Sequence, residues 1–229
     1  MEDCLFRVPR EPLEAESTVF RDIFLLPQAG DVPVEGQNDE NPVVLEGIEN
    51  DDFAQLLKVV LYRLVLILSE HPLCKGLTTK WFRKYGTNQD LPTNNDQWMA
   101  VLKLATLWEF DEIRGVAIDT LALSDLNAVD KVVAAMEYGI EEWLLPAYLS
   151  LVQRPEPISP HEGHRMGLET ALKLASEREK LRLEMVEKGE SCSYCSRHIC
   201  PTTHLVVDGG TPEARSLDFT SIIRAILGL

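Results

Sequence analysis

The chain has 229 residues, of which 45% are hydrophobic, and it carries a formal net charge of −15 at pH 7. The apolar content is ordinary for a folded protein, and the length suits one large domain or two small ones. Because so negative a charge repels phosphate backbones and anionic lipid, direct binding to nucleic acid or to a membrane surface is disfavoured.

The cysteine count and the apolar runs indicate the cellular compartment in which the protein is expected. Five cysteines cannot pair into a complete disulfide set. The longest apolar run, residues 59–68, is interrupted by Arg63 and is too short to cross a bilayer. The N-terminus has acids and a proline where a secretory signal would be apolar. We therefore expect a reduced intracellular protein, cytoplasmic or nuclear.

The N-terminal segment combines an extended pattern with helical ones. Residues 5–8 alternate apolar and polar side chains, which predicts a short strand. Pro12 suits the first turn of a short helix that runs to about residue 16. Ser17 is a candidate N-cap for a helix over residues 18–26, which Pro27 would end.

After a polar loop over residues 28–41, residues 42–46 predict a second strand, which ends at Gly47. Asn50 or Asp51 is then the expected N-cap of a helix. Its apolar face is expected to contain Phe53, Leu56, Leu57 and Val60.

Residues 61–93 differ from their surroundings. Bases outnumber acids over residues 61–90, whereas acids dominate on both sides. Residues 80–85 are basic and aromatic, a combination that can stack on nucleic-acid bases, but the segment is short and belongs to a strongly acidic chain. A nucleic-acid function is therefore not favoured.

Two consecutive amphipathic helices follow, over residues 98–110 and 111–121, with a tight connection at residues 109–111. Asn94, Asn95 and Asp96 are the candidate N-caps of the first helix. No side chain in this hairpin is of a reactive type, so the pattern favours a binding module over an enzyme.

The C-terminal half predicts three further helices. The first begins at Asp125 or Asn127 and ends at Gly139, with Val129, Val132, Val133 and Met136 on its inner face. The second covers residues 141–153, and three prolines then interrupt the pattern. The third is a long helix over residues 163–187, in which residues 177–180 are expected to be solvated. Its inner face is expected to contain Leu168, Ala171, Leu172 and Ala175.

The tail contains a cluster of potential metal ligands: Cys192, Cys195, Cys200 and His204. The Cys-x-x-Cys spacing allows two thiolates to reach one tetrahedral zinc ion, so a tight zinc site is one interpretation. A tail with unliganded cysteines and a redox pair of Cys192 with Cys195 are the alternatives. Residues 217–229 predict an amphipathic helix that docks on the body or on a partner.

Three stretches, at residues 6–24, 41–48 and 96–121, resemble the BTB/POZ domain family. The first carries Ser-x-x-Phe-x-x-Ile-Phe at residues 17–24, after a short strand that ends in a basic residue. The second and third are similar to the family's central strand with its third helix and to its closing helix pair. The amino-acid sequences of these segments look most like those of the BTB proteins of basidiomycete fungi. The resemblance covers roughly residues 3–60 and 91–187.

The resemblance implies an α+β, predominantly helical fold with three parts. Residues 3–124 form the BTB/POZ-like domain, in which residues 61–93 are an atypical insert or a mis-spliced stretch. Residues 125–187 form a helical extension, and residues 188–229 form a cysteine-containing tail. The family's first strand is missing here, which leaves the strand at residues 5–8 as an edge and puts dimerisation in doubt.

The resemblance also implies a non-enzymatic module that binds proteins, either itself or, as an adaptor, a cullin-type ubiquitin-ligase scaffold. The matching surface residues are Asn50, Asp51, Asp52, Phe53 and Gln55. The alternative for the two acids is that they only complement the positive end of a helix. A second function remains open, that of a small zinc-binding regulatory protein that acts through the tail. No catalytic residue is proposed, and no cofactor other than that zinc.

The larger apolar side chains are expected to form the core of the domain, because apolar residues at helical spacing usually pack inward. These are Phe20, Phe24, Leu45, Phe53, Trp98, Leu104 and Trp108.

Overall fold

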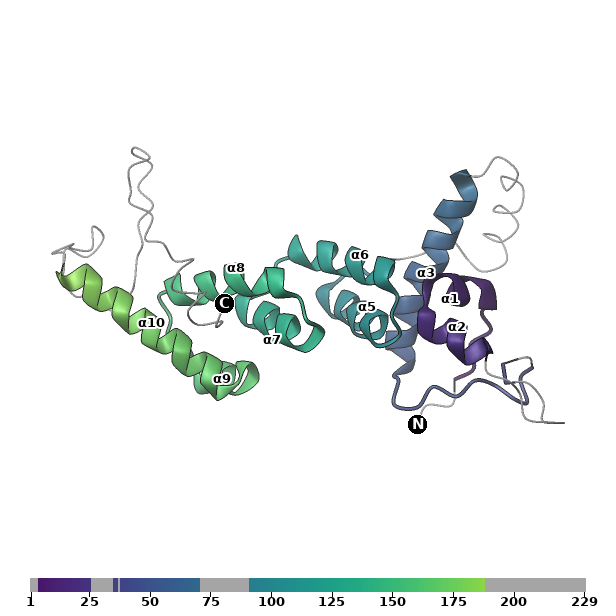
Figure 1. The fold of residues 1–229 in the computed structure, drawn as a ribbon, viewed down its shortest axis with the longest axis horizontal. Helices are drawn as coiled ribbons and strands as arrows, with labels where there is room; N and C mark the ends of the chain where they lie inside the picture. The colour runs from purple at the N-terminus through teal and green to yellow at the C-terminus, as the bar shows by residue number, and fades with distance from the viewer. Residues whose placement is uncertain (1–3, 26–34, 37, 71–90, 188–229) are drawn as a thin grey trace. The chain divides into compact units, whose positions relative to one another are not determined.

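A computed structural model describes residues 4–25, 35–36, 38–70 and 91–187, and for residues 64–70 and 181–187 it describes the backbone only. Two compact units divide the chain between Asp125 and Leu126. Regular structure in the described residues is entirely α-helical, so the prediction of a predominantly helical protein is confirmed (Figure 1). Within these residues, no helix combines the length and apolar character that crossing a bilayer requires.

The first unit contains α1 (Arg10–Glu16), α2 (Thr18–Leu25), α3 (Asn50–Glu70), α5 (Asn95–Leu107) and α6 (Asp111–Ala122). The long helix α3 packs against α5 and against α1, and α5 pairs with α6 as the predicted hairpin (Figure 1). Asn50 or Asp51 was the predicted N-cap of this helix, but Asn50 is already its first helical residue, and the helix continues well into the segment that was predicted to be an atypical insert.

The two predicted strands, at residues 5–8 and 42–46, are wrong: neither segment has regular structure. A strand requires a neighbour whose backbone completes the hydrogen-bonded ladder, and no such neighbour exists among the described residues. The first segment is held instead by a side-chain contact to the loop that precedes the second, because Arg7 Nε donates to Asp39 Oδ1 at 2.9 Å. The α+β class predicted from sequence therefore appears as helices without a sheet in the described residues.

Five aromatic side chains, which we call the aromatic core, lie at the centre of the first unit: Phe6, Phe20, Phe53, Trp108 and Phe110. Trp108 stands edge-on to Phe20 and to Phe53, with ring centroids 5.2 and 5.8 Å apart. Phe110 lies 5.9 Å from Phe20, and Phe6 lies 5.0 Å from Phe53. Three of these pairs, Phe6 with Phe53 and Trp108 with Phe20 and with Phe53, are edge-to-face, which stabilises them beyond the effect of the apolar area that the rings bury.

Most of the predicted core residues are buried, namely Phe20, Phe53, Leu104 and Trp108. The other three, Phe24, Leu45 and Trp98, are only half-buried. Leu45 was expected on a central strand, and its partial exposure agrees with the absence of that strand.

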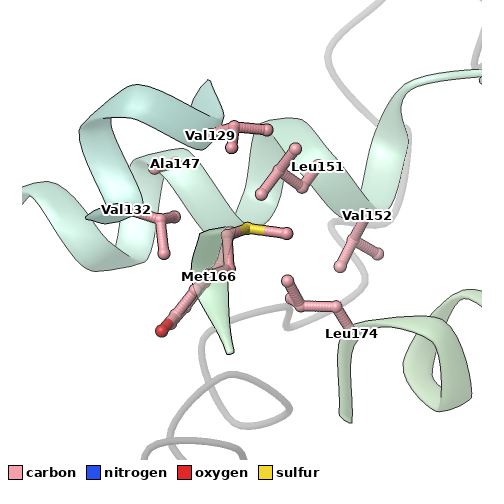
Figure 2. Packing of buried hydrophobic residues seen from close by; sticks show 8 residues of the cluster. Val129, Val132, Ala147, Leu151, Val152, Met166 and Leu174 are labelled. Atoms are coloured by element: carbon pink, nitrogen blue, oxygen red, sulfur yellow. The ribbon is translucent and has the colours of Figure 1, made fainter. Parts of the chain in front are cut away.

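The second unit contains α7 (Ala128–Tyr138), α8 (Glu141–Gln153), α9 (Pro160–Met166) and α10 (Leu168–Glu187). Its core draws on all four helices, and Figure 2 shows these side chains converging. They include Val129, Val132, Ala147, Leu151, Val152, Met166 and Leu174. The predicted N-cap Asn127 and the predicted C-terminal Gly139 are both confirmed, since Asn127 Oδ1 accepts from Asp130 N–H at 2.9 Å and Gly139 has φ +66°.

The predicted long helix over residues 163–187 is instead two helices, α9 and α10. Gly167 separates them with φ +86°, a conformation that glycine adopts readily and other residues do not. The break also changes which face of α10 is inward. Ala171 and Leu174 are buried, whereas Leu168 and Leu172 are 72% and 60% exposed.

Two further sequence predictions in this unit are wrong. Met136 was placed on the inner face of α7 but is 53% exposed. Arg178 belongs to a segment predicted to be solvated, yet it is only 7% exposed. Its guanidinium donates to the carbonyl of Leu151 and, at 3.4 Å, to that of Pro155. These carbonyls lie at and just beyond the end of α8, where helical backbone oxygens lack intrahelical partners.

Candidate protein-interaction site

The candidate surface lies on the first turns of α3. Asp51 is exposed, and Asn50, Asp52 and Gln55 are half-buried. Phe53 is only 7% exposed and belongs to the aromatic core, so its contribution to this region is to hold α3 in place rather than to contact a partner. The polar side chains around it form what we call the α3 surface: Asn50, Asp51, Asp52 and Gln55.

Asp52 already has a partner within the chain. Its Oδ2 lies 2.8 Å from Nζ of Lys103, and the ion pair joins α3 to α5. The Asp52 side chain is 19% exposed and that of Lys103 43%, so the pair is partly screened by solvent and its contribution to stability is modest. Asp52 also lies in the first turn of α3, where negative charge is favourable. Both observations give this acid a structural role.

Of the three other side chains, Asn50 is engaged in an interaction within the chain, and Gln55 and Asp51 differ in how many contacts they make. Gln55 Oε1 accepts a hydrogen bond from Lys58 Nζ at 3.0 Å, along the same helix. Asp51 points its charge to solvent from the first turn of α3. Of the predicted site residues, Asp51 is thus the most available to a partner.

A buried hydroxyl fixes α2 against the hairpin on which α3 packs. The Ser17 side chain is fully buried, and its Oγ accepts from the N–H of Phe20 at 3.0 Å, as the predicted N-cap. The same hydroxyl donates to the carbonyl of Trp108 at 2.6 Å. Sequence reasoning identified the cap but not the second bond, because nothing local links positions that are 91 residues apart.

The connection between α5 and α6 has an unusual backbone. Glu109 has φ +53°, a left-handed conformation that is uncommon outside glycine. The Phe110 N–H donates to the carbonyl of Ala105 at 2.9 Å, and Thr18 Oγ1 donates to the Glu109 carboxylate. The turn is therefore tied both to α5 and to the start of α2.

Arg63 is a residue for which the sequence predicted no contact. It lies on α3, and its guanidinium is 3.6 Å from carboxylate oxygens of both Glu16 and Glu112. It therefore stands between α1 and α6. The irregular composition of residues 61–93 gave no sign of this contact. The helical spacing from Phe53 and Val60 could nevertheless have indicated that α3 continues to residue 63.

The predicted zinc ligands Cys192, Cys195, Cys200 and His204 lie outside the described residues, as do residues 80–85 and 217–229. Within residues 4–25, 35–36, 38–70 and 91–187, no three His, Cys, Asp or Glu side chains gather as a metal site would require. The zinc interpretation therefore stays a prediction from the sequence.

No family model, no curated protein and no solved structure matches this chain. A functional proposal therefore depends on the chain's own residues and packing.

Proposed function

We propose that the chain is a non-enzymatic protein-interaction module of the BTB/POZ type, which acts by self-association, as an adaptor, or in both ways. The observation that supports this proposal best is the aromatic core. It gathers Phe20 from α2 and Trp108 from the end of α5, which lie in the first and third stretches that carry the resemblance, and Phe53 from α3, which follows the second stretch.

The α3 surface is the proposed contact for a cullin-type scaffold. It is acidic, it is held by a packed core, and it is presented by the start of a helix rather than by a loop, which favours a preorganised contact. A partner that fits it offers basic or hydrogen-bond-donating side chains opposite Asp51. Phe53 beneath the surface sets the position of this turn.

A pull-down with cullin scaffolds tests the adaptor role. We expect Asp51→Lys combined with Gln55→Lys to abolish capture, because the charge of the surface is reversed. Glu179→Lys is the matched control, since it makes the same kind of charge reversal at an exposed position on α10. Phe53 is left unchanged because its substitution would disturb the core. Equal capture by both variants, or no capture by the unaltered chain, would eliminate this role.

Sedimentation velocity over a range of concentrations tests self-association. We expect a species of twice the chain mass that becomes more populated as concentration rises. A mass that stays at 25.8 kDa throughout would remove self-association from the proposal and leave the adaptor role to the pull-down.

Metal analysis separates this proposal from the zinc-binding regulatory protein. The Cys-x-x-Cys spacing at Cys192 and Cys195 is what favours that alternative. Stoichiometric zinc in the purified chain that is lost in the Cys192→Ser and Cys195→Ser variants would support it.

A further inference from the structure

The connection between α8 and α9 is organised around one guanidinium. Arg154 Nη1 and Nη2 donate to the two carboxylate oxygens of Glu162 at 2.7 and 2.6 Å, a bidentate pair. Arg154 also donates to the carbonyls of Glu156 and Pro157, at 3.3 and 3.2 Å. The hydrogen bonds from Arg154 hold the pKa of Glu162 at about 2, well below its usual value. The backbone of the connection is therefore held by the same guanidinium that pairs with Glu162.

Ser159 lies beside this pair at the surface. Its side chain is exposed and its backbone is extended, with φ −75° and ψ 157°. Its N–H donates to Glu162 Oε2 at 2.8 Å, and its Oγ accepts from the Glu162 N–H at 3.3 Å. The Ser159 hydroxyl also forms a hydrogen bond to the Glu162 carboxylate and helps to lower the pKa of that group, so a kinase that takes up Ser159 breaks this contact.

The residue that follows is Pro160, at the first position of α9. Protein kinases take their substrates in an extended conformation, and the proline-directed class requires a proline immediately after the target hydroxyl. Within residues 4–25, 35–36, 38–70 and 91–187, Ser159 is the one serine or threonine followed by proline. Exposure, extended backbone and the following proline thus coincide at a single hydroxyl.

We propose that Ser159 is a phosphorylation site of a proline-directed protein kinase, and that the phosphate takes Arg154 away from Glu162. ATP supplies the phosphoryl group: the bond between Ser159 Oγ and the γ-phosphorus forms while the bond between the γ-phosphorus and the bridging oxygen breaks. ADP leaves, and the hydroxyl proton passes to the catalytic base of the kinase.

The consequence follows from the charges at the site. A phosphoserine adds a charge of about −1.5 to −2 at pH 7 and three strong acceptor oxygens. It would stand next to the Glu162 carboxylate, which already contacts the Ser159 backbone. The two anions compete for the single guanidinium of Arg154, and the phosphate carries the larger charge. Arg154 now holds the connection between α8 and α9 through two backbone carbonyls. When the guanidinium moves to the phosphate, this connection rearranges.

The first test is phosphorylation of the full chain by a cyclin-dependent or mitogen-activated protein kinase with ATP, with the modified residue assigned by mass spectrometry. We expect phosphate on Ser159, at least a tenfold lower initial rate in Pro160→Ala, and an unchanged rate in Pro157→Ala, which alters an exposed proline of the same connection but keeps the Ser-Pro pair. Circular dichroism verifies that both variants fold.

Thr211, which Pro212 follows, serves as an internal comparator. Phosphate on Thr211 but not on Ser159 would show an active kinase and would overturn the proposal. So would a chain that takes up no phosphate from kinases that modify a reference peptide, or an unchanged rate in Pro160→Ala.

The second test measures the Glu162 pKa by carbon-detected NMR before and after phosphorylation. We expect the pKa to rise by at least one pH unit, because the carboxylate loses Arg154 and gains an anionic neighbour. In Arg154→Gln the pKa starts higher and phosphorylation shifts it less. A Glu162 pKa that does not move on phosphorylation would refute the transfer of Arg154.

Discussion

Replacing Ser17 with alanine removes two hydrogen bonds at once. The hydroxyl caps α2 through the Phe20 N–H and bonds the carbonyl of Trp108 at 2.6 Å, in a site with no solvent exposure. Loss of an N-cap costs about 1 kcal/mol. A buried carbonyl left without its donor costs about 1–3 kcal/mol more. We therefore expect Ser17→Ala to lower the free energy of unfolding of the first unit by about 2–4 kcal/mol.

Asn94 provides a matched control in the same unit. Its side chain caps α5 by accepting from the Gln97 N–H at 2.9 Å, and it is exposed. Asn94→Ala therefore removes a cap without leaving a buried carbonyl unpaired, and we expect a loss of about 1 kcal/mol. The difference between the two variants isolates the bond from Ser17 to Trp108.

Native-state hydrogen exchange of the full chain, resolved by mass spectrometry, measures these free energies in peptides from α2 and α5. It reports the first unit separately, which matters because a chain with two units need not unfold in one step. A gap of about 1–3 kcal/mol corresponds to roughly a five- to 150-fold difference in protection. Equal losses in the two variants would refute the claim that Ser17 holds α2 on the hairpin.

Three further changes probe the second unit. Because the Glu162 pKa is about 2, below its ordinary 4.5, the pair stabilises the fold above about pH 4.5 and stops doing so as the pH falls toward 2. The free energy of unfolding of Glu162→Gln, measured in urea, should thus be lower by on the order of 1 kcal/mol at pH 7, and the difference should close in acid; a difference that does not change with pH would contradict this. Gly139→Ala should cost about 1–2 kcal/mol in urea unfolding through its left-handed backbone alone, since an added Cβ meets no atom within 4 Å; an unchanged midpoint would argue against that φ. Arg178→Met should cost about 2 kcal/mol in the same assay, and the exposed Lys180→Met less than about 0.5, so similar losses would show that Arg178 is not buried.

The sequence predicted best those features that local chemistry determines. Asn94 and Asn127 cap their helices by accepting from the N–H three residues on, and such contacts are encoded within one turn. Gly139 ends α7 in a left-handed conformation, which is equally local. The hairpin of α5 and α6 followed from its apolar spacing, and its turn lies within one residue of the predicted position.

Features that depend on distant partners were missed. The pattern at residues 42–46 suits a strand, but a strand exists only where a second one completes the ladder. Arg178 lies in a charged run whose composition predicts solvent exposure, and only the docking of α10 beside the end of α8 buries it. Gly167 was overlooked as a break because a single glycine within a helical pattern costs only about 1 kcal/mol and is often tolerated.

Phe53 joins the α3 surface to the core beneath it. Two kinds of substitution can therefore weaken partner binding: those that destabilise the core and those that remove a contact at the surface. Asp51 is exposed at the start of α3, whereas Phe53 is fixed between Phe6 and Trp108. A change at Ser17 reaches the α3 surface only through the hairpin and the rings, so it should weaken partner binding in proportion to the unfolded fraction. A change at Asp51 should weaken binding with only a small loss of stability, because the side chain contributes little to packing and gives up only its favourable charge in the first turn of α3. If the loss of binding matched the loss of stability in both variants, the partner would contact another part of the chain.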